Sequence, residues 1–413
     1  MMDGEPLRLR SGTLPNVDSP LRMTRRVVLT GSGPPFCVRN IDGGADLWYH
    51  RGRDERSGWT ADKQIKRPPI RLSARYPLPL SGQETSMSNP LVLEVKRTIE
   101  LLPKAPFNFD ATMHKPDHFP SADNEWKPGI RWQTMLWQNV PLGLKFENRG
   151  AIDRPVISLS VWSRDELGQD FLNGLTDEIN YRCNLQLDLT EFNRRFGDGP
   201  QLGPIIDKWR GMRPANYSSL YEYLIIAIVL QNATVRRSVN MMQALFENYG
   251  TLLSYDDKEL YCSWEPGVIG RATEQELRQL KVGYRAKSIK RVSEAFARGE
   301  MDEFELRNRS REEQREALLG LYGIGPASVG YILGDVFHHL DELDHISPWE
   351  QKIYSRLFFD TDPDEPVSVD RLLGLFNQRF GGYRMLAVHY FWEDVFWRRK
   401  HEKIGWLEKL IRL

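Results

Sequence analysis

The sequence has 413 residues, of which 40% are hydrophobic and 27% charged, and its 56 basic and 56 acidic residues give a formal net charge of zero. This length predicts two or three globular domains with a substantial core. The balanced charge excludes an overall basic field. Any contact with a polyanion would therefore have to depend on local cations and backbone amides.

The three cysteines, Cys37, Cys183 and Cys262, lie far apart and form no Cys-x-x-Cys or Cys/His cluster. The sequence therefore predicts neither a zinc nor an iron–sulfur site, and it suits a reducing compartment. The longest apolar run, 224–230, is too short to span a bilayer, and the start of the chain lacks a signal-peptide pattern. We expect an intracellular protein without a membrane partner.

Residues 1–95 are rich in Arg, Gly, Pro and Ser, with short β-like pieces such as 26–30, and the role of this N-terminal extension is not indicated by the sequence. From 96 to 200, short alternating or β-branched runs such as 155–162 predict an antiparallel sheet. Residues 170–196 change to a helical period. This part of the chain is predicted to be an α+β domain.

Residues 201–413 are predicted to be all-helical, because segments with apolar residues at helical spacing follow one another between short polar or glycine-bearing turns. No internal repeat is evident. The predicted helices cover 218–231, 234–249, 273–281, 285–298, 311–322, 326–338, 348–358 and 384–399.

Two glycines interrupt the helical pattern in Leu-Tyr-Gly-Ile-Gly-Pro, 321–326. Gly323 and Gly325 allow backbone angles that other residues avoid, and Pro326 suits the first turn of the next helix. The pattern predicts a helix, a tight hairpin and a second helix. The free N–H groups at the start of the second helix would suit a phosphate. An ordinary helix–helix turn is the alternative.

Four ordered segments carry a resemblance to a known family. Residues 321–330, Leu-Tyr-Gly-Ile-Gly-Pro-Ala-Ser-Val-Gly, resemble the hairpin of the helix-hairpin-helix (HhH-GPD) DNA glycosylase superfamily. Residues 280–287 are similar to the Leu-Gly-Tyr-Arg-Ala stretch of 8-oxoguanine DNA glycosylases. Gly-Met-Arg-Pro at 211–214, with the apolar helix after it, and 382–392 resemble the entry to the helical core and the closing helix of the 3-methyladenine DNA glycosylase II family. The chain is most similar to this branch of the superfamily.

The resemblance implies an α+β architecture in which an antiparallel, TBP-like sheet domain, 96–200, precedes an all-helical glycosylase core, 201–413, with the helix-hairpin-helix at 312–338. It implies a base-excision repair enzyme that flips a damaged base out of duplex DNA and cleaves its N-glycosidic bond. Alkylated purines are the first expected substrates, and 8-oxoguanine is the alternative. A non-catalytic DNA-binding or lesion-sensing protein is the alternative from another class.

The family places a catalytic Asp soon after the hairpin, because bond cleavage builds positive charge on the deoxyribose. Glu350 stands at this position in the family's register, and Asp344 is the alternative. The sequence Ser-Pro-Trp-Glu, 347–350, also fits a capping box, so Glu350 could serve only to cap a helix. The extra methylene of Glu would require a rebuilt pocket, or it would mark a chain without glycosylase activity.

Bifunctional members of the superfamily have a Schiff-base lysine two residues after the second hairpin glycine, where this sequence has Ala327. The resemblance therefore implies a monofunctional glycosylase that leaves an abasic site without strand cleavage. It also implies that Gly323, Gly325, Ala327 and Ser328 contact the DNA backbone.

By the same resemblance, Gln231 and Asn232, followed by Arg237, fill the gap left by the flipped base and contact the orphaned base. A polar helix end with solvated arginines is the alternative. The candidates for stacking on the damaged base are Trp349, Tyr390, Phe391 and Trp392, although aromatic residues at helical spacing are more often core residues.

No cofactor is expected to be required. The resemblance implies a structural Na⁺ or K⁺ ion on main-chain carbonyls near Leu319, Leu321 and Ile324. The expected partner is double-stranded DNA with a damaged base, bound by a monomer. The expected location is the cytoplasm, at the nucleoid, or the nucleus.

Overall fold

The computed structural model describes residues 89–114 and 120–410. The chain divides into two units, 1–81 and 82–413, and every described residue belongs to the second unit. Most of the predicted extension, 1–95, including the β-like piece at 26–30, lies outside the described residues. The domain boundaries near 95 and 200 stay predictions.

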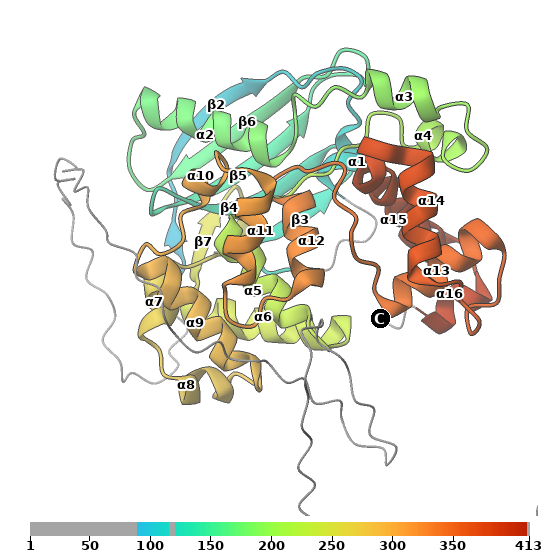
Figure 1. Ribbon diagram of the computed structural model, residues 1–413. Helices are drawn as coiled ribbons and strands as arrows, with labels where there is room; N and C mark the ends of the chain where they lie inside the picture. Colours follow the sequence, from blue (N-terminus) through green and yellow to red (C-terminus); the bar gives the residue numbers. More distant parts are fainter. Residues whose placement is uncertain (1–88, 115–119, 411–413) are drawn as a thin grey trace, which may run out of the picture. The chain divides into compact units, whose positions relative to one another are not determined.

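A five-stranded antiparallel sheet forms the first half of this unit, with strand order β2-β6-β5-β4-β3 (Figure 1). Strands β4 and β5 are joined by Gln138 and Asn139, which both have positive φ, 48° and 63°, as a two-residue hairpin turn requires. The strands are β2 (Val95–Leu101), β3 (Asn124–Lys127), β4 (Ile130–Trp137), β5 (Val140–Asn148) and β6 (Ile157–Ser163).

Both faces of the five-stranded sheet are covered. One face buries Leu144, Phe146 and Leu159 against Leu175 and Ile179 of helix α2 (Gln169–Arg182). The short helix α1 (Phe109–Met113) packs into the same core. This arrangement confirms the prediction of an antiparallel α+β region.

The opposite face of the sheet is covered by a small second sheet of order β1-β7-β8, which adds a β-hairpin to the part of the chain predicted to be all-helical. Its strands are β1 (Leu91–Val92), β7 (Thr251–Tyr255) and β8 (Lys258–Cys262). Gly143 of β5 makes room for this sheet, because a Cβ there would overlap the Tyr255 ring. The all-helical prediction was therefore wrong at 251–262, where apolar alternation around the turn residues Asp256 and Asp257 was overlooked.

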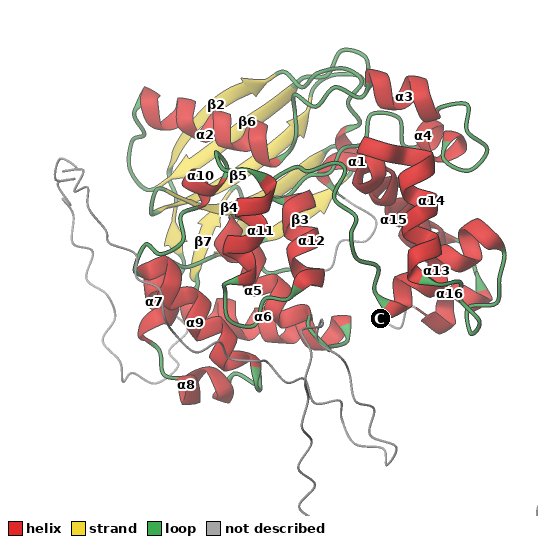
Figure 2. Cartoon of the chain, viewed as in Figure 1, coloured by secondary structure: helices red, strands yellow, loops and turns green. Residues whose placement is uncertain are grey.

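The remaining elements are helices, and each of the eight predicted helical segments overlaps with one (Figure 2). Those eight are α5 (Leu220–Leu230), α6 (Val235–Tyr249), α8 (Glu274–Gln279), α9 (Arg285–Ala297), α11 (Arg311–Leu319), α12 (Pro326–Asp335), α13 (Pro348–Phe359) and α15 (Arg384–His401). The others are α3 (Thr190–Phe196), α4 (Gly203–Lys208), α7 (Pro266–Arg271), α10 (Glu303–Leu306), α14 (Val369–Phe380), the 3-10 helix η1 (Gly381–Tyr383) and α16 (Gly405–Leu410).

The helices gather around two apolar cores. One core is built from α5, α6, α9 and α12, and it includes Leu224, Ile289 and Ile332. The other contains α3 and α13 to α15, with Phe192 and Phe376 fully buried. The loop that carries Asp344 and the start of α13 connects the two cores. The candidate catalytic residues therefore lie on the connection between the helical groups.

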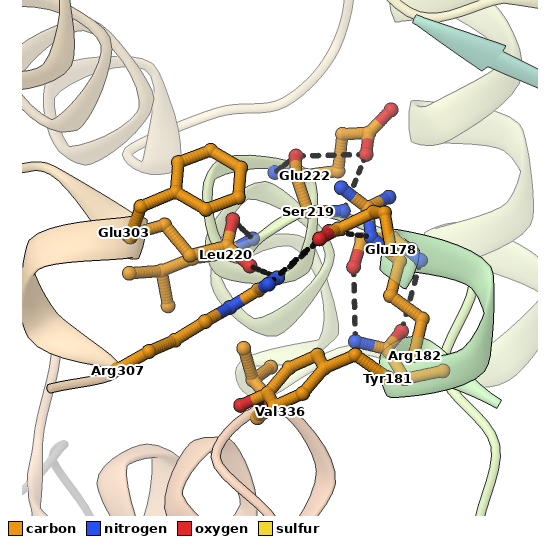
Figure 3. A network of polar contacts seen from close by, with 12 residues as sticks. Glu178, Tyr181, Arg182, Ser219, Leu220, Glu222, Glu303, Arg307 and Val336 are labelled. Atoms are coloured by element: carbon orange, nitrogen blue, oxygen red, sulfur yellow. Dashed lines mark hydrogen bonds and ion pairs between the residues drawn. The ribbon is translucent and has the colours of Figure 1, made fainter. Parts of the chain in front are cut away.

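A buried ionic network links the sheet half to the helical half (Figure 3). Glu178 of α2 accepts two hydrogen bonds from Arg307, at 2.7 Å each, and one from Arg182 at 2.6 Å. Arg307 also pairs with Glu303, which accepts from the Leu220 N–H at the start of α5 at 2.7 Å. Because Glu178 and Glu303 are both buried, this network fixes α2 against α10 and α5.

Candidate nucleic-acid interface and catalytic site

Helices α11 and α12 form the predicted helix-hairpin-helix. Gly323 has φ +85°, and a Cβ there would lie 2.8 Å from the Cβ of Ser288 and closer still to its hydroxyl. Gly325 is the N-cap of α12 with an extended φ of −109°, and a Cβ there would meet nothing within 4 Å. Of the two hairpin glycines, Gly323 therefore needs the backbone freedom of glycine, whereas Gly325 leaves open space in front of the helix.

The N-terminus of α12 is available to an anion. Pro326 occupies its first turn, followed by Ala327 and Ser328, and no side chain of the described residues caps this end of the helix. By contrast, α11 is capped by Ser310 and Glu313. The free backbone N–H groups and the helix dipole at an uncapped N-terminus favour a negatively charged group.

Basic and aromatic side chains lie next to the hairpin. Tyr322, in the hairpin turn, is 44% exposed. The ammonium of Lys287 and the guanidinium of Arg291, both on α9, lie 5.0 and 4.7 Å from the centre of its ring. Despite the zero net charge of the chain, the hairpin therefore has local cations of the kind that contact phosphates.

Gln231 and Asn232, which were predicted to fill the space left by a flipped base, lie beside the hairpin, but Gln231 already makes hydrogen bonds within the protein. Its side-chain amide donates to the main-chain carbonyl of Gly323 at 2.8 Å. The main-chain carbonyl of Gln231 accepts a hydrogen bond from the Arg285 guanidinium. Asn232 has φ 48°, and its side chain lies 3.4 Å from the hydroxyl of Tyr284, which is 55% exposed. Gln231 thus ties the end of α5 to the hairpin, and Asn232 and Tyr284 are the exposed members of this cluster.

Arg237 also belongs to this region. It lies in the first turn of α6 and is exposed. A Cβ on Gly283, which has φ +66°, would lie 3.9 Å from its Nη2 atom. Tyr284 was not predicted from the sequence as a member of this cluster, although it follows Gly283 directly in the segment that resembles 8-oxoguanine DNA glycosylases.

Glu350 is 3% exposed and its carboxylate is held at both oxygens. Oε2 accepts from the Ser347 N–H at 2.8 Å and from the Ser347 hydroxyl at 2.5 Å, which is the capping box of α13. Oε1 accepts from the Tyr331 hydroxyl at 2.5 Å. The capping box predicted from the sequence is therefore formed, and the hydrogen bond from Tyr331 on α12 is an additional feature that the sequence did not indicate.

Asp344, the alternative carboxylate, has a different environment. Its side chain is 61% exposed and pairs with Arg315 of α11 at 3.0 Å. Arg315 also pairs with Glu342, which is buried, and this burial raises the pKa of the Glu342 carboxyl despite the arginine. Asp344 is thus an exposed carboxylate that pairs with an arginine of the first hairpin helix, whereas Glu350 is buried and bonded to Tyr331.

The four aromatic candidates divide into two pairs. Trp349 is 41% exposed and its ring centre lies 4.8 Å from that of the half-buried Trp392. Tyr390 and Phe391 are 0% and 4% exposed and belong to the core, and the Tyr390 hydroxyl donates to the Met212 carbonyl at 2.7 Å. The rings of Tyr390 and Phe391 are therefore enclosed by the core, and of the four only Trp349 is well exposed.

A cavity of about 320 Å³ lies between the sheet and α5, and none of the predicted site residues lines it. Arg131 of β4 lines this cavity. This buried guanidinium donates to the Met113 carbonyl and to the Gln133 side chain, at 2.8 and 2.6 Å, and stacks on Tyr217. Asp335, at the end of α12, also lines the cavity. Sequence reasoning missed this cavity, because its walls come from distant segments.

The carbonyls proposed for a monovalent ion lie at the hairpin. Leu319 is the last residue of α11, and the Leu321 carbonyl accepts from the Ile324 N–H at 3.2 Å. Within the described ranges, no cluster of three or more His, Cys, Asp or Glu side chains could hold a metal ion. No helix of the described residues is long and apolar enough to cross a membrane.

The fold is similar to the folds of solved DNA glycosylases. A 3-methyladenine DNA-glycosylase from Archaeoglobus fulgidus has a TM-score of 0.59 at 16% identity, and the match covers 72% of this chain and 99% of that chain. The structure of MBOgg1 with a low-affinity DNA ligand has a TM-score of 0.57 at 18% identity, covering 75% and 99%. An 8-oxoguanine glycosylase/lyase from Clostridium acetobutylicum has a TM-score of 0.55 at 14% identity, covering 73% and 99%.

No family model matches the sequence, and no curated protein matches it. At these low identities the solved structures establish the fold alone. They confirm the resemblance to the helix-hairpin-helix DNA glycosylases at that level, with a sheet region followed by helices that carry the hairpin.

Proposed function

We propose that this protein is a base-excision repair glycosylase that removes a damaged base from duplex DNA, with Glu350 as the catalytic carboxylate. The observation that carries the proposal is the pairing of an uncapped α12 N-terminus with a buried carboxylate at the start of α13. The first feature suits a DNA phosphate, and the second suits the positive charge that develops on the deoxyribose.

Within this proposal the substrate is an alkylated purine, and 8-oxoguanine is the alternative. The similar TM-scores of the 3-methyladenine and 8-oxoguanine enzymes favour neither substrate. The proposed reaction stops at the abasic site, since Ala327 offers no amine for a Schiff base. A structural Na⁺ or K⁺ at the hairpin, a monomeric state and a location with the DNA are part of the same proposal.

The test is base release from methylated, oxidised and deaminated DNA, assayed by mass spectrometry. We expect the wild-type protein to release 3-methyladenine or 7-methylguanine and Glu350→Gln to release neither. Asp344→Asn should keep the activity. Base release retained in Glu350→Gln, or abolished in Asp344→Asn, would contradict the assignment.

Glu276→Gln is a matched control for helix capping. Glu276 forms the same capping box with Thr273 at the start of α8, with hydrogen bonds of 2.6 and 2.9 Å, and it has no place in the proposed site. A capping box accepts Gln as well as Glu, so Glu276→Gln removes the charge but leaves a side chain that can still cap the helix. If Glu276→Gln keeps the stability and the activity, loss of the charge from a capping box does not by itself account for an inactive Glu350→Gln.

One observation favours the non-catalytic alternative: both oxygens of Glu350 already accept hydrogen bonds within the protein. A lesion-sensing protein would bind duplex with the salt dependence of phosphate contacts but release no base. Absence of release from all three DNA preparations, together with tight duplex binding, would establish this alternative.

A further inference from the structure

A glutamate at the proposed catalytic position needs more contacts than an aspartate to hold its carboxylate in one orientation. Compared with Asp, Glu350 has one more rotatable bond to be fixed before its carboxylate can face a reacting sugar. Ser347 holds only Oε2, and it comes from the same helix start. The other oxygen, Oε1, is held by Tyr331, which comes from α12.

From this geometry we infer that Tyr331 is the positioning residue of the active site: its hydroxyl fixes Glu350 so that a glutamate can serve as the carboxylate. The inference rests on the proposed function and assigns to Tyr331 a role separate from base stacking. Because Tyr331 acts through Glu350, it is expected to affect the chemical step and not the binding of DNA.

The Tyr331 hydroxyl is well suited to donate a hydrogen bond to Glu350. Burial of its hydroxyl and the adjacent Glu350 charge raise the pKa of Tyr331 far above its usual range, so the phenol stays protonated at any working pH. Although the residue is 36% exposed overall, its hydroxyl lies against a carboxylate that is 3% exposed. A hydrogen bond to a charged group in such a poorly solvated place is stronger than one at the surface.

The position of Tyr331 also connects two parts of the site. It lies in the second turn of α12, whose N-terminus is the uncapped end of the hairpin. A phosphate bound at that end and the carboxylate at the start of α13 are therefore joined by one short helix and one hydrogen bond. This contact sets the position of the catalytic carboxylate relative to the bound DNA backbone.

Tyr354 provides a matched control within the same environment. It lies one turn after Glu350 on α13 and is 1% exposed. Burial and the Glu350 charge raise its pKa as well. Among the described residues, however, only Ser347 and Tyr331 donate hydrogen bonds to the carboxylate. Tyr354→Phe thus removes a phenol hydroxyl near Glu350 without removing a bond to it.

The experiment compares Tyr331→Phe and Tyr354→Phe in single-turnover base release and in binding to duplex with an abasic site. Tyr331→Phe should lower the rate of release by about tenfold to a hundredfold, the usual effect of losing a hydrogen bond to a charged group, with an unchanged Kd. Tyr354→Phe should leave both quantities within about twofold. Equal rates in both variants, or a weaker Kd in Tyr331→Phe that accounts for its slower release, would overturn the inference.

A double-mutant cycle tests whether Tyr331 acts through Glu350. Glu350→Asp shortens the side chain and should slow release strongly in the wild-type background but much less in Tyr331→Phe, because the shared bond is already absent. Additive effects would overturn the positioning role. A wild-type protein that releases no base would instead refute the proposed function, and with it this role of Tyr331, so the two failures are distinguishable.

Discussion

Removal of Arg307 should reveal how strongly the sheet half and the helical half depend on their buried network. In Arg307→Ala, Glu178 loses two of its three hydrogen bonds from arginine, and Glu303 loses its ion pair. The guanidinium also stacks on the Tyr181 ring, with its carbon 3.9 Å from the ring centre. Breaking a buried ion pair on one side costs about 3 to 5 kcal/mol.

We expect a destabilisation near the lower end of that range, about 3 kcal/mol, because Arg182 remains beside Glu178. The entropy of unfolding is about 2.1 cal/mol/K per residue, so a unit the size of 82–413 has about 0.7 kcal/mol/K. The melting temperature should then fall by about 4 °C. Thermal unfolding followed by circular dichroism and calorimetry measures this change.

Arg309→Ala is the control for Arg307→Ala. Its side chain is 43% exposed and pairs with Glu305, which is 60% exposed, at the spacing of one helical turn. Such surface pairs contribute little to stability, because water and salt screen the two charges. Equal melting temperatures for Arg307→Ala and Arg309→Ala would refute the reasoning that burial gives the network its strength.

Three further predictions concern the hairpin, the pH dependence and the cations. Gly323→Ala should cost about 1 to 3 kcal/mol of stability because of its φ of +85° and its close neighbour, whereas Gly325→Ala should keep the stability and weaken duplex binding, as paired melting and binding measurements would show. His338 has its pKa lowered to about 4 by burial and by the nearby arginine, so the unfolded chain, near 6.5, binds its proton more readily and stability should fall by about 1 to 2 kcal/mol from pH 7 to pH 5. Asn tolerates the φ of 61° at this position, so His338→Asn should fold and should lose less stability between pH 7 and pH 5 in melting curves. An equal loss of stability in the wild type and in His338→Asn would show that His338 does not cause it. Replacing Lys287 and Arg291 by Gln should lower the slope of log K against log salt by about 1 for each DNA phosphate that is no longer neutralised, and an unchanged slope would exclude them from the interface.

The sequence predicted the features that short segments specify. Helices such as α5 and α9 were recognisable because their apolar residues repeat with the helical period over several turns. The hairpin followed from two glycines and a proline, and the capping box of Glu350 from a spacing of three residues. In each case the interacting groups lie within a few residues of one another, so their geometry is fixed by the local backbone.

The tertiary structure alone determined which distant segments meet. The β7–β8 hairpin was overlooked since its strands, 251–255 and 258–262, are short and are stabilised by packing against the larger sheet. The bond from Gln231 to the hairpin joins residues 92 positions apart. The contact of Tyr331 with Glu350 depends on where the tertiary structure places α12 and the start of α13, because no local rule relates residues on different helices. Sequence therefore predicted the candidate carboxylate and its capping box, and the tertiary structure added the hydrogen bond from Tyr331.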